Sequence, residues 1–128
     1  MSYTVKNLRE VEDSAVKFGF FETQEARFAN RDLGAEHTGV SLHLVLPGKR
    51  QAFAHRHDQA EEIYVVLRGS GRVKLDDDVV EVGPLDAIRV APAVTRAFEA
   101  GAEGLEFLAF GPRHEGDGEL IHGGFWED

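Results

Sequence analysis

The chain has 128 residues, a length typical of one compact domain, and we expect residues 1–128 to form a single domain. Its 23 acidic side chains outnumber its 14 Lys and Arg side chains, and the formal net charge of -9 disfavours binding to nucleic acids and to anionic lipid surfaces. The chain has no cysteine, so any metal site must use His and carboxylate ligands. The N-terminus lacks the apolar stretch of a signal peptide, and the longest aliphatic and aromatic run, residues 63–67, is too short to cross a bilayer. We therefore expect a cytoplasmic protein without membrane or nucleic-acid partners.

The middle of the chain contains seven short apolar segments typical of β-strands. They are residues 40–46, 62–67, 72–75, 79–82, 87–90, 96–99 and 105–110. Turn-forming residues separate them, among them Pro47-Gly48, Gly83-Pro84 and a predicted hairpin turn at Gly69-Ser70-Gly71. This spacing predicts an all-β protein, an antiparallel sandwich or barrel, with irregular N- and C-terminal extensions.

Two histidines, His55 and His57, stand two residues apart and are followed by two glutamates. In an extended strand such residues share a face, so both imidazoles can bind one divalent ion. Strand alternation after the predicted turn at residues 58–60 favours Glu61 as the third ligand, although a turn resets the facing and both faces of the next strand are apolar. The residues alone therefore leave Glu61 and Glu62 open.

The stretch resembles the first motif of the cupins: Gly, a spacer, His-x-His, three or four residues, Glu, six residues, Gly. The matching positions are Gly48, His55, His57, Glu62 and Gly69, with a first spacer one residue longer than usual. Only Glu62 satisfies both later intervals, and the resemblance extends from about residue 40 to residue 110.

The resemblance implies a small single-domain bacterial cupin, whose fold is a jelly-roll barrel, also called a double-stranded β-helix. It also implies one divalent ion (Mn, Fe, Ni, Zn or Cu) inside the barrel, held by His55, His57, Glu62 and a later His.

The second cupin motif is not present. Its positions fall at Leu85, Ala91, Ala93, Arg96 and Ala100, none of which matches. Arg96 stands where the resemblance places the fourth ligand, and a guanidinium has no lone pair to donate to a cation.

Two hypotheses follow for Arg96. In the first, His55, His57 and Glu62 hold a metal with open positions, and Arg96 binds the carboxylate of a substrate. In the second, Arg96 pairs with Glu62 in a metal-free barrel, and the imidazoles are ordinary polar lining.

Tyr64 and His43 are candidate catalytic residues. Tyr64 can supply a proton or a hydrogen bond to substrate, although a strand tyrosine is more often buried with its hydroxyl satisfied. His43 can act as an acid or base, or replace the missing ligand, if its face of the strand lines the cavity; the alternative is a structural histidine.

We expect a metal-dependent enzyme acting on a small organic acid by oxygenation, isomerisation or decarboxylation. The alternative is a non-catalytic module that binds or senses a small ligand. A homodimer is expected because strand 62–67 has two apolar faces and only one can line the cavity. The aromatic residues of the C-terminal tail, Phe125 and Trp126, predict docking over the barrel or onto a second subunit.

Overall fold

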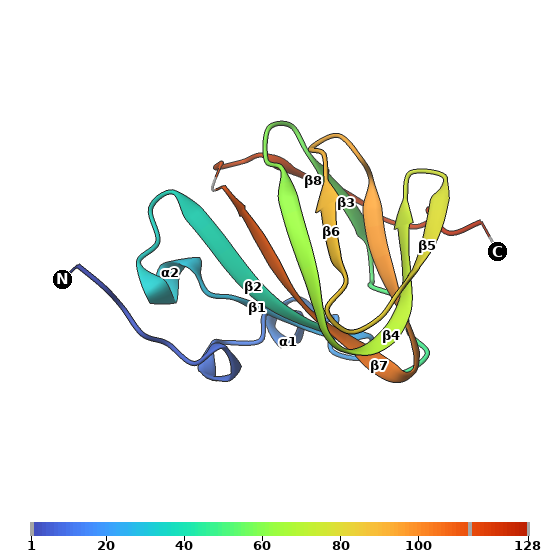
Figure 1. Cartoon of the computed structure of the whole chain (residues 1–128), viewed down its shortest axis with the longest axis horizontal. Helices are drawn as coiled ribbons and strands as arrows, with labels where there is room; N and C mark the ends of the chain where they lie inside the picture. Colours follow the sequence, from blue (N-terminus) through green and yellow to red (C-terminus); the bar gives the residue numbers. More distant parts are fainter. Residues whose placement is uncertain (1, 113, 128) are drawn as a thin grey trace.

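The computed structural model describes residues 2–112 and 114–127. Within them, eight strands form one sheet, in which each pairing is antiparallel. The strands are β1 (Gln24–Phe28), β2 (Thr38–Val45), β3 (Ala54–His57), β4 (Glu62–Leu75), β5 (Asp78–Val82), β6 (Ala87–Val90), β7 (Arg96–Pro112) and β8 (Gly118–Ile121). The sheet curls into a jelly-roll barrel, which confirms the predicted all-β fold class (Figure 1).

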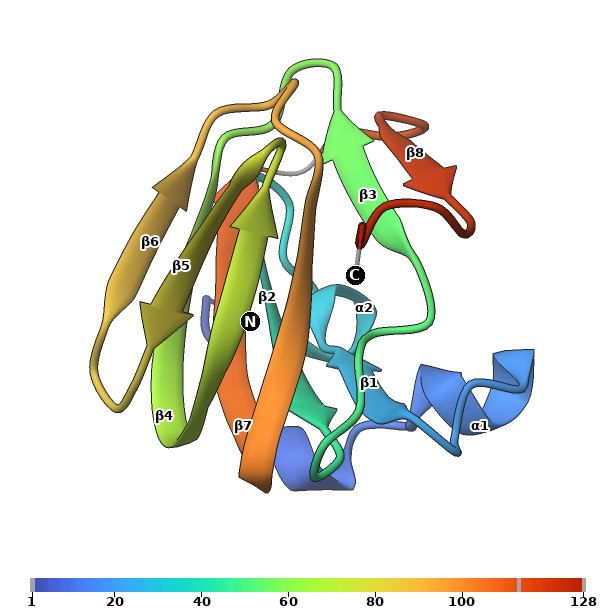
Figure 2. The same ribbon diagram turned by 90° about the vertical axis from the view of Figure 1, so that its right-hand side faces the viewer.

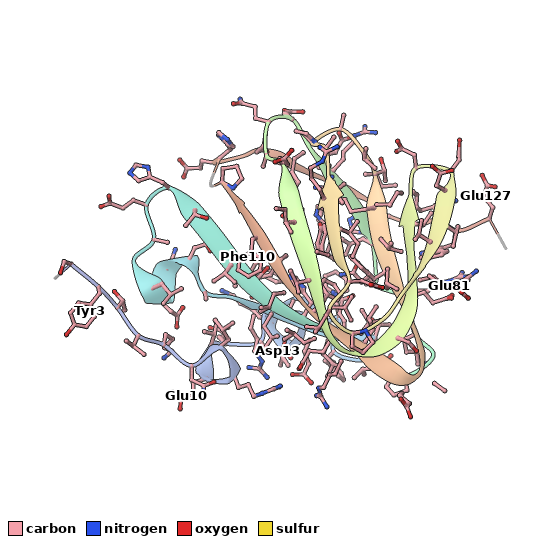
Figure 3. All side chains as sticks on the ribbon, viewed as in Figure 1. Tyr3, Glu10, Asp13, Glu81, Phe110 and Glu127 are labelled. Carbon is pink, nitrogen blue, oxygen red and sulfur yellow. The ribbon has the colours of Figure 1, made fainter. Side chains whose placement is uncertain are left out.

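Among the described residues, three short helices lie in the N-terminal part: the 3-10 helix η1 (Leu8–Glu10), α1 (Ser14–Phe18) and α2 (Asn30–Leu33). Ahead of η1, the chain reaches away from the sheet, and Tyr3 is exposed there (Figure 3). None of the helices in the described part of the chain is long and apolar enough to cross a membrane.

The long strand β7 pairs with strands on both sides of the barrel, namely β4 on one side and β2 and β3 on the other. Its first half lies opposite the end of β4 and meets β3 at the pair His55 and Arg96. Its second half pairs with β2 and with the start of β4. Figure 2 shows the result: β4, β5 and β6 lie on one side, and β3 with β8 beside it lies on the other.

The predicted hairpin turn at Gly69-Ser70-Gly71 is wrong, because these residues lie inside the continuous strand β4. A Cβ atom on Gly69 would collide with the carbonyl oxygen of Gly104, and one on Gly71 with that of Glu99. The pairing of β4 with β7 also shifts register here. The glycines therefore permit a close approach of two bent strands at a bulge and do not reverse the chain.

The extensions are more regular than the sequence predicts, since β1 pairs with β2 and β8 pairs with β3. The buried positions of β1 are Gln24 and Ala26, a polar and a small residue, so this edge strand carries no visible apolar alternation. The C-terminal tail docks on its own barrel: the Trp126 ring lies 4.5 Å from the Arg50 guanidinium carbon, and Lys74 donates a hydrogen bond to the Phe125 carbonyl.

The core lies inside the barrel, and the alternation of β4 decides which side chains enter it. Tyr64 and Val66 are buried, whereas Ile63 and Leu67 on the outer face are 42% and 38% exposed. Phe110, the cross-strand neighbour of Ile63, is also partly exposed. This outer apolar face is the one that the predicted homodimer would cover, and the homodimer stays a prediction.

We expect Phe98→Ala to lower the free energy of unfolding by about 3–5 kcal/mol, the usual cost of truncating a core aromatic residue. Phe98 is 1% exposed, and its ring centroid lies 4.1 Å from that of Phe107. Urea unfolding measures the change. The control Phe18→Ala alters a ring that is 65% exposed and should cost less than about 1 kcal/mol. Similar losses in the two variants would contradict this placement of the core.

Candidate metal centre

Three strands bring the candidate site together. His55 and His57 come from β3 and have ring centroids 5.1 Å apart, while Glu62 begins β4. One potential ligand atom from each of these residues lies within 4.8 Å of the others. Arg96, at the start of β7, is the direct cross-strand partner of His55. The sequence-predicted ligand set and the Arg therefore meet in one place.

Glu62, and not Glu61, faces the histidines. Glu61 lies on the outer surface, where its carboxylate accepts a hydrogen bond of 3.1 Å from Arg89. The preference for Glu61 from strand alternation is wrong. Tyr64 and Val66 are the buried side chains of β4, and by alternation Glu62 shares their face.

One carboxylate oxygen, Glu62 Oε1, makes four short contacts. It accepts hydrogen bonds from the Tyr64 hydroxyl at 2.6 Å and from Arg96 Nη2 at 2.8 Å. His55 Nε2 lies 3.2 Å away and His57 Nε2 3.3 Å away. Burial alone would raise the pKa of Glu62, but the contacts with His55, His57 and Tyr64 outweigh it and hold the pKa well below its usual range. The site therefore contains a fixed negative charge.

Arg96 is fully buried and faces protein acceptors with most of its N–H groups. Beyond its bond to Glu62, its Nε donates to the Tyr64 hydroxyl at 3.1 Å, and its Nη1 donates to the carbonyls of Pro92 and Val94 at 3.0 and 2.6 Å. These contacts form the Arg96–Glu62 pair of the second hypothesis. The substrate-binding role of Arg96 stays a prediction.

Tyr64 connects Arg96 to Glu62. Its hydroxyl donates to Glu62 and accepts from Arg96, and its side chain is buried. Burial and the neighbouring Glu62 carboxylate raise the pKa of Tyr64 well above its usual value, so the hydroxyl keeps its proton at neutral pH. The contacts fit the structural alternative, and its catalytic role stays a prediction.

His43 lies near these residues but outside the three-residue ligand group found among the described residues. Its ring stacks on Phe107 with centroids 5.1 Å apart, and its Nε2 lies 2.8 Å from the Ser41 hydroxyl. Burial, and secondarily His55, lowers the pKa of His43 to about 4, so the ring is neutral at pH 7. These contacts fit a structural histidine, and an acid or base role stays a prediction.

A pocket of about 180 Å³ opens onto the site. His57, Glu62, Ser41 and Asp117 line it, with Phe28 and Ala109 among the apolar residues. Its volume suits a molecule of a few non-hydrogen atoms, since sites for drug-sized ligands are about 300–1,000 Å³. A larger hollow of about 540 Å³, between Lys74 and the C-terminal tail, contains none of the three candidate ligands.

Asp117 is a site residue that sequence reasoning missed. Its carboxylate lies 3.3 Å from His57 Nδ1 and accepts hydrogen bonds from the backbone of residues 58–60. Burial would raise the pKa of Asp117, but these three backbone N–H groups and His57 lower it. No local motif marks this residue, because its partner His57 lies sixty residues earlier in the chain. The extension that contains Asp117 also shows no strand pattern in the sequence.

The donor set fits a divalent metal ion. Both ring nitrogens of His57 are buried, and neither makes an aligned hydrogen bond to the described residues, although Glu62 Oε1 lies 3.3 Å from Nε2 and Asp117 Oδ2 lies 3.3 Å from Nδ1. Burial is the main cause that lowers the pKa of His55 and favours its neutral, metal-ligating form. Two imidazoles and one carboxylate form the ligand set typical of non-haem iron sites that keep open positions.

We expect the free energy of unfolding to decrease as the pH is lowered below about 6.5. In the variant His43→Phe this decrease should be less steep. Burial lowers the folded-state pKa of His43 to about 4, below the ordinary histidine value of 6.5, so between these pH values the unfolded chain binds a proton that the folded protein does not. The free energy of unfolding therefore carries no penalty from His43 above pH 6.5. On acidification this residue lowers it, by about 3 kcal/mol near pH 4. Urea unfolding between pH 4.5 and 7.5 measures the slope.

The control for this slope is His37→Phe, which alters a histidine whose side chain is 94% exposed and should leave the pH dependence unchanged. A His43→Phe protein with the full wild-type slope would show that His43 does not titrate as its burial requires.

The cupin domain model matches residues 41–111, more than half of the chain. A search of the curated proteins gave no match. Among solved structures, a cupin protein from Bacteroides fragilis is 22% identical with a TM-score of 0.72, covering 91% of this chain and 88% of that chain. The polyketide cyclase RemF from Streptomyces resistomycificus is 22% identical with a TM-score of 0.75, covering 98% of this chain and 88% of that one.

Oxalate decarboxylase from Bacillus subtilis is also 22% identical, with a TM-score of 0.70; the match covers 91% of this chain but 32% of the decarboxylase. At these identities the likenesses concern the fold, and the resemblance of the first motif agrees with the family match. The barrel topology, the His-x-His and Glu62 arrangement and the match over residues 41–111 together establish that this chain belongs to the cupin family.

Proposed function

We propose that this cupin binds one divalent metal ion through His55, His57 and Glu62 and acts on a small organic acid. The observation that carries the proposal is the convergence of the three ligand atoms within 4.8 Å of one another beside a small pocket. The buried ring nitrogens of His57, which lie 3.3 Å from carboxylate oxygens without an aligned hydrogen bond, support it further. When bound, the ion would polarise a substrate oxygen, a requirement shared by oxygenase, isomerase and lyase chemistry.

The residues around the proposed ligands hold Glu62 in place. Tyr64 and Arg96 both donate to its Oε1, while Oε2 takes part in none of these contacts. Because Arg96 is itself held by two backbone carbonyls, the carboxylate has little rotational freedom. A ligand fixed in this way loses little conformational entropy when it binds a metal.

A small acid is the substrate class that charge and volume support best. Arg96 places a buried cation beside the site, and a divalent ion would add further positive charge, so an anion is attracted. The pocket of about 180 Å³ admits a short carboxylic acid. The similar fold of oxalate decarboxylase, an enzyme named for a two-carbon acid, is consistent with this class.

A second candidate function is a metal-free cupin that binds or senses a small ligand without turnover. The 2.8 Å bond between Arg96 and Glu62 favours it, because the pair neutralises the carboxylate that a metal would otherwise neutralise. The two functions differ in metal content, which makes them separable.

We expect the purified protein to contain one divalent ion per chain, and His57→Ala to abolish this binding, since two ligands hold a divalent ion weakly. Elemental analysis by mass spectrometry after growth in metal-replete medium gives the stoichiometry. The control His37→Ala removes an exposed histidine and should keep the metal. Wild-type protein that stays metal-free, also after dialysis against Mn, Fe, Ni, Zn and Cu salts, would contradict the metal proposal and favour the second candidate.

We expect Arg96→Gln to lower the free energy of unfolding by about 3–5 kcal/mol, because it removes the fully buried cation that pairs with the partly buried Glu62 carboxylate. Urea unfolding measures this loss, and titration with oxalate measures carboxylate binding by the metal-loaded protein. The control Arg89→Gln breaks the exposed pair with Glu61 and should cost about 1 kcal/mol or less. A stable Arg96→Gln protein that keeps its metal but loses oxalate binding would assign Arg96 to substrate capture, as the first hypothesis states.

A further inference from the structure

Asp117 presents a buried carboxylate to the metal centre from outside the residues that match the family model. It lies just before β8, beyond residue 111, and its side chain is 4% exposed. Its Oδ1 accepts hydrogen bonds from the backbone N–H groups of Asp58 and Gln59, at 3.1 and 2.8 Å. Its Oδ2 accepts from Ala60 at 3.0 Å and lies 3.3 Å from His57 Nδ1. Both oxygens therefore act as acceptors.

From this arrangement we infer that Asp117 is a positioning residue for the metal centre: its Oδ2, 3.3 Å from His57 Nδ1, keeps the ring proton on that nitrogen and leaves the Nε2 lone pair for the metal ion. The inference deepens the proposed function and rests on it where metal affinity is concerned. A carboxylate behind a metal-binding imidazole fixes the tautomer and the ring orientation and makes the imidazole a stronger ligand.

The competition between two carboxylates decides the tautomer. His57 Nε2 also faces an oxygen, Glu62 Oε1, at 3.3 Å, so a proton could in principle reside on either ring nitrogen. Glu62 Oε1 already accepts from Tyr64 and Arg96. Asp117 Oδ2 accepts one hydrogen bond, from Ala60, and has the greater remaining acceptor capacity. The proton is thus favoured on Nδ1.

The same carboxylate holds the turn that joins the histidines to Glu62. Three consecutive backbone N–H groups, those of residues 58–60, point to Asp117, and the Asp58 N–H also lies 3.2 Å from the Asp117 carbonyl. Pairing of β3 with β8 delivers Asp117 to this position, since His57 lies opposite Gly118. The turn places Glu62 on the inner face of β4, so Asp117 supports two of the three ligands.

Charge balance gives Asp117 a further effect. Arg96 adds a positive charge beside the ligand group, which by itself would repel a cation. Glu62, Arg96 and Asp117 together carry a net charge of about minus one when all are ionised, so the site still attracts a divalent ion.

Asp117→Asn tests the inference, because the amide can keep the acceptor for residues 58 and 59 while placing an N–H donor opposite His57. In metal-free protein at pH 8, imidazole ¹⁵N spectra should show the Nδ1–H tautomer for wild-type His57 and the Nε2–H tautomer for the variant. The His57 resonances are assigned by their loss in His57→Gln. The dissociation constant for Zn²⁺, measured by chelator competition, should rise 10- to 100-fold in Asp117→Asn.

The matched control is Glu119→Gln, which removes one negative charge from the same segment. Glu119 pairs with Arg56 on the surface, so both the tautomer and the Zn²⁺ dissociation constant should stay as in wild type. If Asp117 had only a structural role, Asp117→Asn would lower the melting temperature without changing the His57 tautomer.

A wild-type Nε2–H tautomer overturns the inference, and this measurement decides it even if Asp117→Asn does not fold. An unchanged tautomer in a folded variant, with a Zn²⁺ dissociation constant within twofold of wild type, also overturns it. If wild-type protein binds no metal, the proposed function fails. The His57 tautomers of the wild type and of Asp117→Asn still decide the role of Asp117.

Discussion

The structure depends on how one partly buried carboxylate, that of Glu62, is stabilised. A charged group removed from water costs several kcal/mol unless it is paired and hydrogen-bonded. Here the partners come from three strands: His55 and His57 from β3, Tyr64 from β4 and Arg96 from β7. The need to satisfy this charge therefore fixes how the strands meet at the centre of the barrel.

Arg96 is the residue in which stability and function are most closely connected. In the structure its guanidinium is fully buried and holds Glu62, Tyr64 and the loop carbonyls of Pro92 and Val94 in one network. A bidentate bond to an incoming carboxylate needs two free, adjacent N–H groups. With most of its donors engaged, Arg96 is better suited to orient Glu62 and to supply a positive field than to bind the substrate directly.

The C-terminal extension is part of the site as well as of the fold. Strand β8 pairs with β3, and the segment before it brings Asp117 behind His57. Farther along, Phe125 and Trp126 dock against Lys74, Arg50 and Arg72 on the same barrel. Residues beyond the family-matched domain thus contribute both a buried carboxylate and an aromatic cover.

The sequence by itself determined the fold class, most strand positions and the pair His55 and His57, because apolar runs and two-residue spacing are local patterns. The first motif's intervals also distinguished Glu62 from Glu61. Only the tertiary structure decided which face of β4 is buried, that Gly69 and Gly71 lie in a bulge and that Asp117 meets His57. Each of these depends on contacts between segments far apart in the chain, where the energy of burial and pairing is set by neighbours that no local pattern specifies.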